Sequence, residues 1–122
     1  MKTLLFSLLF VMIGFGSFAQ APMQNINGNA NAIVSKLNTA LTLTEVQKTK
    51  LLDGVTAFLN QRALILPLAT DNPKAYDTKL KSMHNGFYRK VKSLLTPDQY
   101  SRFLELKPVE NDKLNVLSQL FY

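Results

Sequence analysis

Two segments of the chain carry the same short pattern, a Leu-Thr pair with a glutamine three residues after the threonine. The segments are Leu43-Thr44-x-x-Gln47 and Leu95-Thr96-x-x-Gln99, and their threonines are 52 positions apart. In such a capping box the threonine hydroxyl accepts a hydrogen bond from the glutamine N–H, and the glutamine side chain reaches back to the threonine N–H. The pattern therefore predicts helices that begin directly after each threonine, with all four side chains acting as helix caps.

Apolar residues elsewhere recur at steps of three and four, which places them on one face of a helix. They occupy residues 30–41, 51–63 and 80–94. Asn72 followed by Pro73 is typical of the start of the third helix, and Pro67 is expected to end or kink the second. Because no stretch alternates with a period of two, no strand is predicted. The predicted fold is all-α, a small bundle of four to five short helices around a helical hairpin.

The N-terminus has the pattern of a cleavable export signal. Lys2 precedes an apolar run over residues 4–15, and small residues up to Ala19 fit the site that signal peptidase reads. An uncleaved anchor is the alternative, but the run is shorter than the roughly 20 residues of a membrane-spanning helix. The expected divisions are a signal peptide over residues 1–19, a flexible lead-in over 20–29 and one helical domain over 30–122. We expect a periplasmic or secreted protein.

Several kinds of site are excluded by composition. The chain has no cysteine, so it can form no disulfide, thiolate metal site or cysteine nucleophile. Its one histidine, His84, has no carboxylate three or four positions away, so a closed metal site lacks ligands. No serine-histidine-acid pattern and no glycine-rich phosphate loop is present. We expect no catalytic residue, no metal, no cofactor and no enzymatic activity.

A basic cluster on the third predicted helix is the most distinctive surface feature. Together with neighbouring apolar side chains it could attract anionic segments and then hold unfolded chain. The alternative is that the apolar residues form the buried seam of the helix and the basic residues its solvated back. The candidate client-binding residues are Lys79, Lys81, Met83, Phe87, Tyr88, Arg89, Lys90 and Lys92.

The two Leu-Thr-x-x-Gln patterns, in a small basic helical chain behind an export signal, resemble the Spy/CpxP family of Gram-negative periplasmic proteins. The resemblance covers roughly residues 40–106. It implies an all-α dimer built as an antiparallel cradle of helices. It also implies an ATP-independent chaperone that holds partly unfolded clients, and some members of the family damp an envelope-stress sensor.

Two functions are therefore expected, from different classes. The first is an exported chaperone-like or envelope-stress binding protein whose partners are unfolded proteins and which forms a homodimer. The second is a structural or regulatory protein that docks on one partner through its apolar C-terminal segment, Leu114–Tyr122. Nucleic acid is not an expected partner of an exported chain without a nucleic-acid motif. A membrane surface would suit the positive charge but ranks below protein partners.

Overall fold

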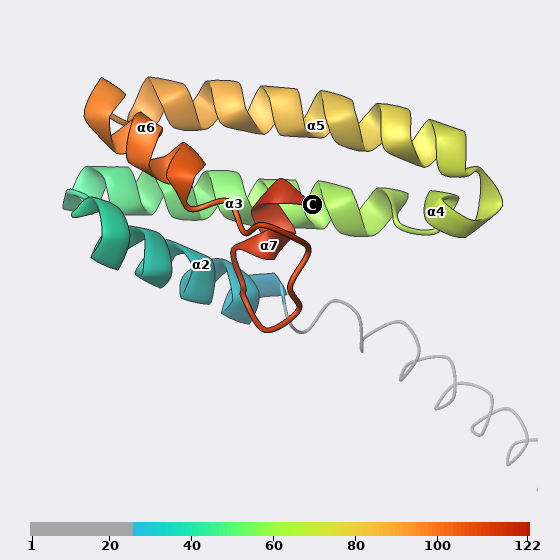
Figure 1. Ribbon diagram of the computed structural model, residues 1–122, viewed down its shortest axis with the longest axis horizontal. Helices are drawn as coiled ribbons and strands as arrows, with labels where there is room; N and C mark the ends of the chain where they lie inside the picture. Colours follow the sequence, from blue (N-terminus) through green and yellow to red (C-terminus); the bar gives the residue numbers. More distant parts are fainter. Residues whose placement is uncertain (1–25) are drawn as a thin grey trace, which may run out of the picture.

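The computed structural model describes residues 26–122, and these residues form six helices and no strand (Figure 1). The helices are α2 (Ile26–Leu41), α3 (Glu45–Ile65), α4 (Leu68–Asp71), α5 (Pro73–Leu94), α6 (Pro97–Glu105) and α7 (Ser118–Phe121). The predicted all-α fold is confirmed, with four main helices and two single turns. The predicted signal peptide and the first residues of the predicted lead-in lie outside the described residues.

The helix α2 begins earlier than its apolar face indicated. It starts at Ile26, so residues 26–29 are helical rather than part of a flexible lead-in. Buried residues begin only at Ala30, and this is why the spacing of apolar residues missed the first turn. Ile26 packs, partly buried, against the core and gives that turn an anchor.

The two longest helices, α3 and α5, form an antiparallel hairpin closed by the single turn α4 (Figure 1). As predicted, α3 ends two residues before Pro67. The Asn72 side chain accepts a hydrogen bond from the Ala75 N–H at 3.2 Å, and Pro73 takes the first helical position of α5. Both features follow from local rules, since proline cannot continue a helix but fits its first turn.

The remaining helices cover one end and one side of this hairpin. The helix α2 packs along α3, and α6 packs against both α2 and α5. Residues 106–122, which we call the C-terminal strap, follow α6 and return over α3, where α7 docks (Figure 1). The strap buries Leu117, Leu120 and Phe121 in the core of its own chain. Within residues 26–122 no helix combines the length and the apolarity needed to cross a membrane.

Replacing Gly54 by alanine is expected to raise the free energy of unfolding by about 0.5–1 kcal/mol, because glycine is a poor residue inside a helix. Gly54 lies within α3, and a Cβ there would meet only the Lys90 side chain of α5, at 3.5 Å from Cε. That distance is ordinary van der Waals contact, so the methyl group fits. Urea denaturation measures the change.

The matched control is Gly86→Ala in α5, where a Cβ would meet no atom within 4 Å. Both variants should gain similarly from helix propensity. A loss of stability in Gly54→Ala alone would mean that α3 and α5 approach each other more closely than described here.

Candidate functional site

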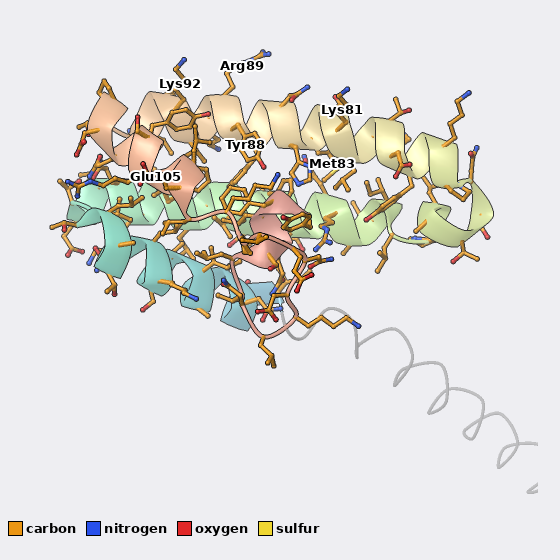
Figure 2. The ribbon with its side chains drawn as sticks, in the orientation of Figure 1. Lys81, Met83, Tyr88, Arg89, Lys92 and Glu105 are labelled. Atoms are coloured by element: carbon orange, nitrogen blue, oxygen red, sulfur yellow. The ribbon has the colours of Figure 1, made fainter. Side chains whose placement is uncertain are left out.

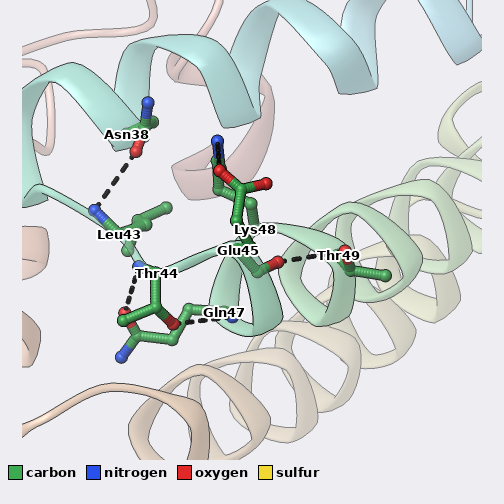
Figure 3. A network of polar contacts seen from close by, with 7 residues as sticks. All are labelled: Asn38, Leu43, Thr44, Glu45, Gln47, Lys48 and Thr49. Atoms are coloured by element: carbon green, nitrogen blue, oxygen red, sulfur yellow. Dashed lines mark hydrogen bonds and ion pairs between the residues drawn. The ribbon is translucent and has the colours of Figure 1, made fainter.

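Both predicted capping boxes are present. The Thr44 N–H donates to Gln47 Oε1 at 3.0 Å, and the Gln47 N–H donates to Thr44 Oγ1 at 3.1 Å (Figure 3). At the second box the Thr96 N–H donates to Gln99 Oε1 at 3.0 Å, and the Gln99 N–H donates to Thr96 Oγ1 at 3.2 Å. The prediction that these four residues cap α3 and α6 is confirmed.

The two glutamines also bind each other, which the sequence did not predict. Gln47 Nε2 donates to Gln99 Oε1 at 2.8 Å, and Gln99 Nε2 lies 3.3 Å from Gln47 Oε1. Gln47 Nε2 also donates to the Leu94 carbonyl at the end of α5, and Gln99 Nε2 to the Leu41 carbonyl at the end of α2. Each glutamine of this pair, which we call the glutamine bridge, thus serves the start of its own helix and the end of a distant one.

The glutamine bridge joins two equivalent helix-turn-helix units, α2-α3 and α5-α6. The carbonyls that it satisfies belong to helix ends, which otherwise lack partners. The turn between α2 and α3 has one extra residue, Thr42, with a positive φ of 53°. The Asn38 side chain supports this turn by accepting the Leu43 N–H at 3.2 Å (Figure 3). The bridge therefore fixes the open end of the α3/α5 hairpin.

The structure divides the predicted client-binding cluster between two faces of α5. Lys81, Arg89 and Lys92 point away from α3, whereas Met83 and Tyr88 point toward it (Figure 2). All five basic residues of the cluster are exposed, and none has a carboxylate oxygen within 4.0 Å among residues 26–122. They are Lys79, Lys81, Arg89, Lys90 and Lys92.

Phe87, one of the predicted client contacts, has most of its surface enclosed within the hairpin. Phe87 is only 6 % exposed, with its ring 4.8 Å from that of Phe58 on α3. Tyr88 is half-buried among Phe103, Phe121 and His84. These residues form the seam of the hairpin, as the alternative interpretation of the pattern proposed. Met83 is half-buried and keeps part of its surface open.

A groove remains on the outside of this seam, between α3 and α5. It consists of two adjoining hollows of about 370 and 320 Å³ that share Gln61, Ser82 and Met83. Its floor is apolar, with Phe58 and Met83 in one hollow and Ile65 in the other. Lys90 lines the first hollow and Lys79 the second. We call this feature the α3/α5 groove.

Small residues keep the α3/α5 groove open. Gly54, Ala57 and Gly86 line the first hollow, and the position of a Cβ at Gly86 meets no atom within 4 Å. Leu64 lies at the second hollow and is 79 % exposed. The groove thus offers apolar contact beside two unpaired lysines, which is the chemistry expected of a surface that holds apolar, anionic chain.

A second distinctive group lies under the C-terminal strap. His84 Nε2 and Arg62 Nε are buried, and neither has a hydrogen-bond partner among residues 26–122. Burial lowers the pKa of His84, and the positive charges of Arg62 and Lys107 lower it further, while the backbone of Leu120 opposes the shift. Burial likewise raises the pKa of Tyr88, with smaller contributions from two neighbouring tyrosines.

Among residues 26–122 no group of three or more His, Asp or Glu side chains is placed to hold a metal ion. The arrangement of the helices is therefore the feature that can be compared with other proteins. No protein-family model matches this chain, and no characterised protein or solved structure shows significant similarity to it.

Proposed function

We propose that this chain is an exported, ATP-independent holding protein of the Spy/CpxP type, which binds partly unfolded protein segments in the α3/α5 groove. The observation that carries the proposal is the apolar floor of the groove beside Lys79 and Lys90, neither of which has a carboxylate partner among the described residues. Unpaired lysines can approach an anionic segment without first breaking an ion pair.

The two parts of the groove would act at different stages of binding. Positive charge accelerates the approach of anionic chain, and the net charge of +6 favours the same partners. Apolar contact with Met83 and with the exposed Leu64 would then slow dissociation, since each buried CH₂ contributes about 0.8 kcal/mol.

The proposed relation to the Spy/CpxP family rests on the paired Leu-Thr-x-x-Gln patterns behind a predicted export signal. A dimer is part of the same proposal, since it would place two grooves in one particle. The other candidate function, docking on one partner through residues 114–122, has a structural cost. Leu117, Leu120 and Phe121 are buried in this chain, so the segment would first have to leave its own core.

Neutralising the two groove lysines, in K79Q/K90Q, is expected to weaken suppression of client aggregation about three- to tenfold, because two favourable charge contacts are lost. Light scattering of three unrelated denatured proteins, with the holding protein at near-stoichiometric ratio, measures the effect. The loss should shrink at high salt, where the same contacts are screened in the unmodified protein.

The matched control is K81Q/K92Q, which removes the same charge from the outer face of the same helix (Figure 2). It should retain most of the activity. Equal losses in the two variants would assign the effect to net charge instead of the groove. Failure of the unmodified protein to protect any of the three clients would refute the proposed function.

A further inference from the structure

The C-terminal strap covers an aromatic cluster that belongs to the hairpin and to α6. The ring of Phe121 lies 5.2 Å from that of Phe103 and 6.1 Å from that of Tyr88. The docked residues are nearly inaccessible, whereas the connecting chain is open, with Leu114 97 % exposed. The strap thus consists of a short buried apolar segment, residues 117–121, joined to α6 by exposed chain.

Few polar contacts hold the strap to the rest of the described chain. Lys36 Nζ donates to Asn115 Oδ1 at 3.1 Å, and the backbone of Leu120 interacts with the His84 ring of α5. Two other hydrogen bonds lie within the strap itself. The Tyr122 hydroxyl donates to the Pro108 carbonyl, and the Asp112 N–H donates to Ser118 Oγ. Docking therefore depends chiefly on apolar packing.

His84 is half-buried beside the docked strap, with the backbone of Leu120 near its ring. Its ring is 5.3 Å from Phe58 and 5.7 Å from Tyr88, and its Nε2 is buried without a partner. The charged groups that face it are both positive, Arg62 from α3 and Lys107 from the strap. Burial raises the pKa of Tyr88, so its phenol carries no charge at and below neutral pH.

We propose that the C-terminal strap is an acid-released cap, and that protonation of His84 opens it to uncover an aromatic, cationic face. The imidazolium would be half-buried beside two positive charges, with the backbone of Leu120 as the opposing contribution, and undocking the strap returns the ring to water. The uncovered face combines Phe103 and Tyr88 with His84 and Arg62. It is suited to ligands that are both apolar and anionic, and this inference does not depend on the proposed holding function.

The direction of the pH effect follows from linkage. The pKa of His84 is lowered when the strap is docked and returns toward its ordinary value when the strap is open. The open state therefore binds more protons below about pH 6.5, and acidification favours opening. For each unit between the two pKa values, the ratio of open to docked strap can rise by up to about tenfold.

Hydrogen exchange measured by mass spectrometry on the full chain tests the proposal at about pH 7.5 and about pH 5.0, with rates corrected for the intrinsic effect of pH. We expect amides of residues 115–122 to lose protection at the lower pH, by up to about tenfold for each unit between the two pKa values, while the α2-α3 turn keeps its own. The anionic aromatic dye ANS should bind over the same pH range.

H84Q should abolish both changes, because glutamine does not titrate. The control is H84Q/N85H, which restores one histidine at the adjacent exposed position and should also lack the switch. Equal strap protection at both pH values in the unmodified chain would overturn the proposal. So would an unchanged acid response in H84Q, or simultaneous loss of protection throughout residues 26–122.

Discussion

Phe103→Ala is expected to lower the free energy of unfolding by about 3–5 kcal/mol, the usual cost of removing a fully buried ring. Phe103 is 0 % exposed and lies where α6, α5 and the strap meet. Its ring contacts those of Tyr88, Tyr100 and Phe121. Because small domains are stable by only about 5–15 kcal/mol, chemical denaturation should show a large shift of the midpoint.

The adjacent variant Leu104→Ala is the control, since Leu104 is 46 % exposed on the same helix. It should cost less than about 1 kcal/mol, as is usual away from a core. If the two variants differ by less than that, α6 does not pack as described. Phe103→Ala should also loosen the strap, because Phe121 loses the nearer of its two aromatic neighbours.

Gln47→Glu is expected to destabilise the protein by about 2–3 kcal/mol, although glutamate is as good as glutamine in a simple capping box. A carboxylate can still accept from the Thr44 N–H, and its charge suits the start of α3. It cannot donate to the Leu94 carbonyl or to Gln99 Oε1, and these are the two bonds that Gln47 donates in the glutamine bridge. The variant therefore separates capping from bridging.

Thr44→Ser is the matching control, because serine keeps the hydroxyl cap and leaves the glutamine bridge untouched. Denaturant unfolding of both variants gives the comparison. Were Gln47→Glu as stable as the unmodified chain, Gln47 would act only as a cap of α3.

Features set by neighbouring residues were predictable from the sequence. The starts of α3, α5 and α6 depend on threonine, asparagine and proline chemistry within four residues, and all three are confirmed. The start of α2 was placed too late because its first turn is polar and is anchored by Ile26 alone. The glutamine bridge was not predictable by these rules, since it joins residues 52 positions apart through tertiary packing.

The candidate site shows the same division. The positive charge on α5 is evident from the sequence, but the prediction takes the client-binding cluster as one surface. Helical spacing separates it, because Lys79, Met83, Gly86 and Lys90 follow steps of four, three and four and so share the groove face. Docking of the strap depends on three-dimensional fit with Phe103 and Tyr88, and the sequence left open whether that segment packs on its own chain or on another.

The glutamine bridge couples two helix-turn-helix units and so holds the hairpin that carries the groove. A double-mutant cycle of Gln47→Ala, Gln99→Ala and the combined variant, measured by denaturant unfolding, tests it most directly. We predict an interaction energy of about 1–3 kcal/mol, with the second substitution costing much less than the first. Additive losses, with an interaction energy near zero, would contradict the account and leave two independent helix caps.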